Sequence, residues 1–166
     1  MSLLLIPATN DDIDDIVRLR NDASAHLTST NGKGPYSGNM TDKGVRFEMR
    51  RATVYVARDV DGVLLATLTL GTRKPWSIDA AYFTKCKKPL YLTSMAVAPS
   101  MQRQGVGRQC LEEARRIARE WPADFVRLDA FDAVGGAGEF YARCAFREVG
   151  RVTYRQCPLI YYEIEA

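Results

Sequence analysis

The sequence Gln102-Arg103-Gln104-Gly105-Val106-Gly107-Arg108 lies between an apolar run, residues 90–98, and a segment with a strong helical pattern. In a strand-loop-helix unit, glycines allow successive backbone N–H groups to turn toward one point, and the following helix adds the positive end of its dipole. Amide and arginine side chains also surround the glycines, which a simple turn does not require. The stretch therefore predicts a site for a phosphate-bearing ligand.

Two familiar phosphate-binding loops do not fit this stretch. A nucleotide-hydrolysing P-loop requires Gly-x-x-x-x-Gly-Lys-Ser/Thr, but Gly107 is followed by Arg108 and Gln109. A dinucleotide fingerprint requires a third glycine where this chain has Cys110, and it normally opens its domain. A turn that only starts a helix remains the alternative interpretation.

Length and composition indicate one ordinary domain, residues 1–166, which is long enough to bury a core without disulfides or metal. The net charge of +3 suits a polyphosphate ligand but is too small and dispersed to indicate nucleic acid as a partner. The four cysteines lie far apart and only one histidine is present, so we expect no metal site and reduced thiols, which favours a cytoplasmic location. No segment approaches the ~20 apolar residues of a membrane span, so no membrane association is expected.

The order of elements predicts an α/β fold with a single mixed sheet and helices on both faces. Apolar alternation and turn signals predict strands at 2–6, 52–58, 63–72, 90–98, 124–131, 146–154 and 159–165. Helices are predicted from a cap at Thr9 to about His26, over a short segment ending at Arg51, from the glycine loop to about Trp121, and over 135–144. Residues 28–44 and 72–89 are the least patterned and are expected to be loops.

Three stretches resemble the GCN5-related N-acetyltransferase (GNAT) superfamily. Residues Gln102 to Gly107 meet the family's Arg/Gln-x-x-Gly-x-Gly/Ala loop, and Leu92-Thr93-Ser94-Met95-Ala96-Val97-Ala98-Pro99 is similar to the strand that leads into it. Phe140-Tyr141-Ala142-Arg143-Cys144-Ala145-Phe146 resembles the family's Phe/Leu-Tyr-x-x-x-Gly-Phe. Two positions depart from the pattern: Ala145 replaces the usual glycine, and Val134 stands where many members have an asparagine. The resemblance implies a mostly antiparallel sheet of about seven strands.

The resemblance also implies acetyl-CoA as cosubstrate, held between splayed strands, with no metal. A bulge in the strand over Met95 to Val97 would free backbone N–H groups for the thioester and pantetheine, and the amides of Gln104 to Arg108 would hold the pyrophosphate. The coenzyme-binding residues implied in this way are Met95, Ala96, Val97, Gln102, Arg103, Gln104, Gly105, Val106, Gly107 and Arg108.

Tyr141 is the implied general acid, because the family's tyrosine lies close to the coenzyme sulfur and a phenol can donate a proton to the leaving thiolate. A core tyrosine with a satisfied hydroxyl is the alternative. The general base is open among Asp129, Asp132, His26 and a water chain; His26 is otherwise expected to end the first helix and to interact with its dipole. Cys144, one turn from Tyr141, raises the alternative of a ping-pong mechanism, although a packed thiol fits better without a nearby histidine.

The function expected from these features is acetyl transfer from acetyl-CoA to a primary amine by direct attack in a ternary complex. The alternative is a module that binds acyl-CoA as a sensor without turnover. The acceptor, a small-molecule or peptide amine, is left open, and residues 28–44 and 72–89 are its expected walls. Dimers are common in the family, so a homodimer is compatible with the resemblance.

Overall fold

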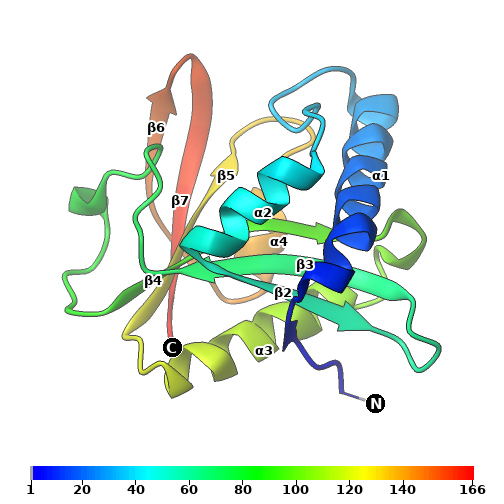
Figure 1. The fold of residues 1–166 in the computed structure, drawn as a ribbon. Helices are drawn as coiled ribbons and strands as arrows, with labels where there is room; N and C mark the ends of the chain where they lie inside the picture. The colour runs from blue at the N-terminus through cyan, green and yellow to red at the C-terminus, as the bar shows by residue number, and fades with distance from the viewer. Residues whose placement is uncertain (1) are drawn as a thin grey trace.

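A computed structural model describes residues 2–166 and shows a seven-stranded sheet in the order β1-β2-β3-β4-β5-β7-β6 (Figure 1). The strands are β1 Ile6–Pro7, β2 Thr53–Arg58, β3 Leu64–Gly71, β4 Pro89–Val97, β5 Phe125–Phe131, β6 Arg147–Tyr154 and β7 Cys157–Glu165. The helices are α1 Ile13–Asn31, α2 Asp42–Arg51, α3 Val106–Glu120 and α4 Gly138–Arg143, with 3-10 turns η1 Asn10–Asp12, η2 Ala80–Tyr82 and η3 Pro99–Met101. The predicted mixed α/β class is confirmed.

The sheet divides in its middle. Every neighbouring pair of strands is antiparallel except β4 and β5, which run parallel and pair only over Pro89–Tyr91 and Phe125–Arg127. Beyond these residues β4 continues beside β3, while β5 continues beside β7. The two strands therefore diverge toward their carboxyl ends, as Figure 1 shows, and they leave a split in the sheet.

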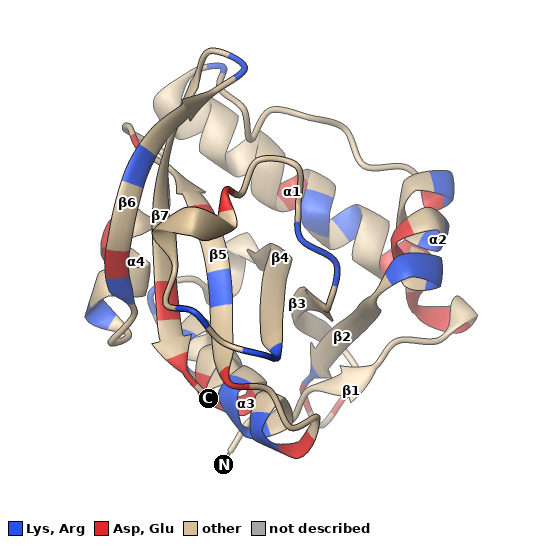
Figure 2. Ribbon diagram, turned by 90° about the vertical axis from the view of Figure 1, so that its left-hand side faces the viewer, with Lys and Arg blue, Asp and Glu red and all other residues tan. Residues whose placement is uncertain are grey.

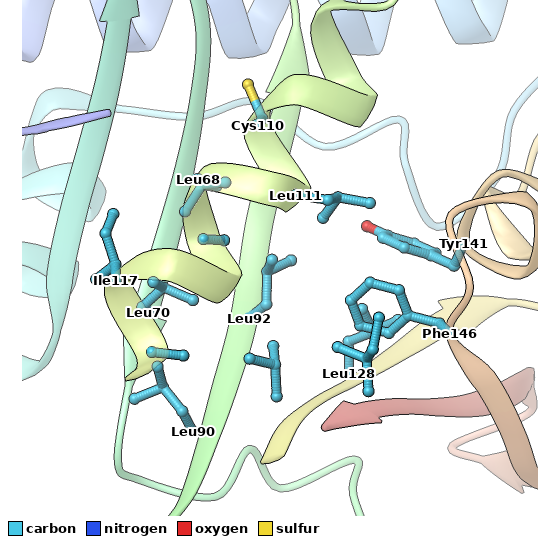
Figure 3. Close-up of a cluster of buried hydrophobic side chains, with 14 of the residues drawn as sticks. Leu68, Leu70, Leu90, Leu92, Cys110, Leu111, Ile117, Leu128, Tyr141 and Phe146 are labelled. Atoms are coloured by element: carbon cyan, nitrogen blue, oxygen red, sulfur yellow. The ribbon is translucent and has the colours of Figure 1, made fainter. Parts of the chain in front are cut away.

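The helices cover both faces, each over its own core. Leucines of β3 and β4 pack against Cys110, Leu111 and Ile117 of α3, with Tyr141 and Phe146 at the edge of this cluster (Figure 3). On the other face, α1 and α2 pack on a second cluster that includes Val45, Val54 and Val56. Alternate residues of a strand point to opposite faces, so each side of the sheet receives its own apolar set.

The predicted first strand at 2–6 is wrong in extent, because only Ile6 and Pro7 pair with β2. The preceding residues run along α3 instead: the Leu3 amide donates to Gln109 at 3.2 Å and the Leu5 amide to Glu113 at 3.3 Å. Side chains of α3 thus take the place of a neighbouring strand. Sequence alternation cannot distinguish these two kinds of partner.

The first helix is longer than predicted. The cap is confirmed, since the Thr9 amide donates to Asp12 at 2.8 Å and the Thr9 side chain accepts from the following turn. The helix then continues to Asn31, where Gly32 with φ 81° ends it. His26 therefore lies inside the helix, and the expectation that it ends the helix is wrong. Hydroxyls in the last turns bond to carbonyls of the preceding turn, which lets a polar sequence remain helical.

Residues 2–166 contain four free cysteines and no group of three potential metal ligands from histidine, cysteine, aspartate or glutamate. No helix among these residues is long and apolar enough to cross a membrane.

Candidate active site

A bulge interrupts β4 on the side that pairs with β3. Thr93 faces Thr69 and Ala96 faces Thr67, so the stretch of β4 between the two pairs is one residue longer than that of β3. Ser94 adopts a left-handed φ of 52° to accommodate the extra residue. Such a bulge removes residues from the hydrogen-bonded ladder and redirects their backbone groups. It lies directly before the segment Met95–Val97 and in the part of β4 that has left β5.

A cleft of about 480 Å³ opens between this bulge, the start of α3 and α4, and we call it the coenzyme cleft. It brings together eight of the ten residues expected to bind coenzyme, with Tyr141: Met95, Ala96, Val97, Gln102, Arg103, Gly105, Gly107 and Arg108. The side chains of Gln104 and Val106 lie elsewhere. Gln104 donates to the Ser100 carbonyl at 2.8 Å, and Val106 is buried in the core beneath α3. These two residues can contribute only their backbone amides to the cleft.

The two glycines of the loop have different physical roles. Gly105 is the N-cap of α3 with φ 84°, a left-handed conformation that glycine adopts without a steric penalty, and no side chain caps the helix. The first N–H groups of α3 are therefore left without a capping side chain. Gly107 has ordinary backbone, but a Cβ there would meet the Phe140 ring at 2.9 Å. Gly105 thus sets the chain direction, whereas Gly107 allows α4 to approach α3.

The charge of the coenzyme cleft suits a polyphosphate. Three arginines line it, Arg103, Arg108 and Arg143, and no acidic side chain does. Arg108 is held by a hydrogen bond to the Arg143 carbonyl at 3.1 Å, which draws the start of α3 toward the end of α4. Helix N–H groups and arginines are donors that bind phosphates. The neutral apolar wall along Met95–Val97 suits the rest of the coenzyme, so these residues fit acetyl-CoA.

Tyr141 lies in α4 with its side chain buried, and it is one of the residues that line the coenzyme cleft. The rings of Phe140, Phe146 and Tyr162 surround it at centroid distances of 5.3, 5.6 and 6.1 Å. Its hydroxyl has one hydrogen-bond partner, the Met95 sulfur at 3.9 Å, and a thioether is a weak acceptor. Core packing therefore accounts for the position of the ring, but the hydroxyl has no strong hydrogen-bond partner among residues 2–166.

Burial raises the pKa of Tyr141 well above its ordinary value, and the negative charge of Asp129 raises the pKa further. The phenol consequently keeps its proton at neutral pH, as a proton donor must. Burial also raises the pKa of the Cys144 thiol, although the nearby Arg108 and Arg143 oppose this effect. Cys144 lines the coenzyme cleft but lacks the base that would activate it.

The structure separates the three candidate bases. Asp132 is paired with Arg151 at 3.3 Å, and His26 is exposed on α1 and does not line the coenzyme cleft. Asp129 lies on β5 just beyond Arg127, the last residue that pairs with β4, and accepts a hydrogen bond from Ser77. Of the three, only Asp129 lies on a strand that borders the split in the sheet.

Sequence reasoning missed several residues of the coenzyme cleft. Ala23 and Leu27 of α1 line it, although their helical spacing indicated only a core face. Phe140, Arg143 and Cys144 also line it, and of these only Cys144 was considered above, as a nucleophile. Their position within the Tyr141 motif was the available signal for these three. Val134, at the position of the family's asparagine, is exposed and brings no polar group.

A second cleft of about 450 Å³ begins at the same bulge, and we call it the distal cleft. Thr93 and Ser94 line its inner end, α2 supplies one wall, and Arg73 to Trp76 supply the other. Of the two expected acceptor walls, segment 72–89 thus contributes four residues and segment 28–44 only Gly44. The remainder of segment 28–44 reaches the end of β5, where Tyr36 packs against Phe131.

Comparison with known proteins agrees with this geometry. A family model described as "Acetyltransferase (GNAT) family" matches residues 19–146, and no curated protein matches the chain. A GNAT-family acetyltransferase structure from Listeria monocytogenes has a TM-score of 0.76 and 18% identity, covering 99% of this chain and 95% of that one. A ribosomal-protein-alanine N-acetyltransferase from Brucella melitensis has a TM-score of 0.72 and 20% identity, covering 99% and 100%. These structures share the fold, and because the family match spans most of the sequence, the chain belongs to the GNAT family of acetyltransferases.

Proposed function

We propose that this protein is an acetyl-CoA-dependent N-acetyltransferase that transfers the acetyl group to a primary amine by direct attack in a ternary complex. The observation that carries the proposal is Tyr141, which lines a cationic cleft and whose hydroxyl has only a thioether as its partner. Family membership supports acetyl transfer in general. The choice of coenzyme and the role of each residue are part of the proposal.

Acetyl-CoA, when bound, supplies an activated thioester carbonyl for the amine. The N–H groups at the start of α3, with Arg103 and Arg108, would bind its phosphates, because helix N-termini and arginines both favour anions. The backbone released by the bulge would hold the reacting end and stabilise the developing oxyanion. These contacts would hold the acetyl group near the split between β4 and β5.

Two side chains would move protons. Tyr141 would donate its proton to the leaving thiolate, since its raised pKa keeps it protonated until the thiolate forms. Asp129, on the β5 side of the split, would accept a proton from the acceptor ammonium through water, since it lines neither cleft. The raised pKa of Cys144 argues against an acetyl-cysteine intermediate and therefore supports direct attack.

The test begins with acetyl-CoA binding by calorimetry, followed by thiol release with a panel of primary amines. Tyr141→Phe should lower kcat by about tenfold or more while acetyl-CoA affinity stays nearly unchanged. Because the lost hydroxyl has only a weak acceptor, the free energy of unfolding should change by less than about 1 kcal/mol. Tyr162→Phe is the matched control, since this neighbouring tyrosine is buried but does not line the coenzyme cleft. An unchanged kcat in Tyr141→Phe would remove the catalytic role.

A sensor that binds acyl-CoA without turnover is the second candidate. The observation in its favour is that no carboxylate or imidazole lines the coenzyme cleft, so no base adjoins the thioester directly. Binding of acetyl-CoA without thiol release from any amine would favour the sensor. Absence of binding would reject both candidates.

A further inference from the structure

The distal cleft is positively charged and lies beside the proposed reaction centre. We infer that the occupant of the distal cleft is the acceptor, a primary amine that carries a carboxylate and an apolar side chain, as an amino acid does. This inference rests on the proposed N-acetyl transfer. Its carboxylate would bind Arg73 and Arg51, and its amine would point toward the bulge.

The two clefts meet at one place on β4. Ser94 lines the distal cleft and Met95, the next residue, lines the coenzyme cleft. A molecule in the distal cleft can therefore reach the thioester at the bulge, where the chain has left both the β3 ladder and β5. This geometry requires the reactive amine to be at the inner end of the acceptor, with the rest of the molecule toward the rim.

The ionised groups of the distal cleft favour an anion at that rim. Three basic side chains line it, Arg51, Arg73 and Lys74. Arg73 has no ion pair or hydrogen bond within residues 2–166, whereas Lys74 donates to the Pro75 and Ile78 carbonyls at 3.1 and 2.5 Å. Figure 2 shows basic segments of α2 and of the loop after β3 on the same side of β4. Arg73 is consequently the side chain most available to an incoming carboxylate.

The one acidic side chain in this lining does not cancel the charge. Glu48 is bound by both terminal nitrogens of Arg20, at 2.8 and 3.2 Å, and also accepts from Thr69. Arg20 is itself buried, so this pair is internally neutral. The lining therefore keeps a net positive charge, which disfavours a polyamine and favours an amine with a compensating anion.

Two large apolar side chains of the same lining are exposed. Phe47 is 53% exposed and Trp76 89% exposed, one on each wall of the distal cleft. The Arg51 guanidinium lies 5.0 Å from the Phe47 ring, which directs it along the same wall. Apolar surface beside an unpaired guanidinium matches an amino acid with an aliphatic or aromatic side chain.

The experiment compares amino acids with their decarboxylated counterparts. L-phenylalanine and L-leucine are assayed against phenethylamine and isoamylamine, with spermidine as a cationic amine, by kcat/KM for thiol release. Their binding to the protein saturated with CoA is measured in parallel by calorimetry, so the result does not depend on turnover. We expect the carboxylate-bearing amines to be preferred by about tenfold or more, the effect of one charge-assisted hydrogen bond.

Arg73→Gln should remove that preference while leaving phenethylamine and CoA binding unchanged. Lys85→Gln is the control, because Lys85 is exposed on the same segment, outside the distal cleft, and its substitution changes the net charge equally. A preference for spermidine or decarboxylated amines, or an equal effect of Lys85→Gln, would overturn the inference and leave acetyl transfer intact. Absence of acetyl-CoA binding would instead reject the proposed function, and the inference with it.

Discussion

Ala145 has a left-handed backbone conformation, and replacing it with glycine should stabilise the protein. Its φ is 69° at the end of α4, where it occupies the position after the C-cap of a Schellman motif. The Phe146 amide donates to the Tyr141 carbonyl at 3.1 Å and the Ala145 amide to the Ala142 carbonyl at 3.2 Å. The motif holds Phe146 against Tyr141, which lines the coenzyme cleft.

The magnitude follows from two opposing terms. Left-handed backbone costs an alanine about 1–2 kcal/mol, which glycine avoids. Glycine adds about 0.4–1 kcal/mol of backbone entropy to the unfolded state. Ala145→Gly should therefore raise the free energy of unfolding by about 0.5–1 kcal/mol, and the melting temperature by about 1–4 °C for a chain of this size.

The assay is urea unfolding together with calorimetric melting, with Ala142→Gly as the matched control. Ala142 is also exposed, but it lies in the right-handed body of α4, where glycine should cost about 0.5–1 kcal/mol. The two variants remove the same methyl group three residues apart and should shift stability in opposite directions. Destabilisation by both variants would refute the reasoning from backbone conformation.

Four further variants test the coenzyme cleft and the proposed general base. Gly105→Ala should lower the free energy of unfolding by about 0.5–1 kcal/mol, because its φ is positive and the same two terms oppose each other as at Ala145. Gly107→Ala should displace the Phe140 ring and raise the acetyl-CoA dissociation constant measured by calorimetry. Cys144→Ala should retain kcat within about threefold, with initial-rate patterns that remain sequential; ping-pong patterns in the unaltered protein would contradict direct attack. Asp129→Asn should lower kcat by about a hundredfold, as expected for loss of a general base, and leave acetyl-CoA affinity unchanged. A loss of acetyl-CoA affinity would instead assign Asp129 to coenzyme binding.

The features that the sequence predicted well are governed by local interactions. The Thr9 cap and the start of α3 depend on residues within a few positions of one another. The glycines beside Arg103 and Arg108 indicated an anion site because helix N–H groups and glycine conformation are short-range properties. The departure at Ala145 was also visible, although only its φ showed that it is strained.

The errors arose where a distant segment supplied the partner. The apolar alternation at 2–6 predicted a strand, but Gln109 and Glu113 of α3 bind those amides. The general base was undecidable in the sequence, because the positions of Asp129, Asp132 and His26 relative to the clefts depend on tertiary packing. Ala23 and Leu27 had the spacing of core residues, and only the tertiary structure shows that they line the coenzyme cleft.

The sequence by itself determined the mixed α/β class, the glycine loop that starts α3 and the tyrosine motif, since each depends on residues close together in the chain. Tertiary structure alone decided where β4 parts from β5, which residues the bulge releases and that two clefts meet there. Strand register and divergence follow from packing between distant segments, which no local pattern encodes. The charge of the distal cleft likewise required Arg51 and Arg73, from different elements, to be brought to one surface.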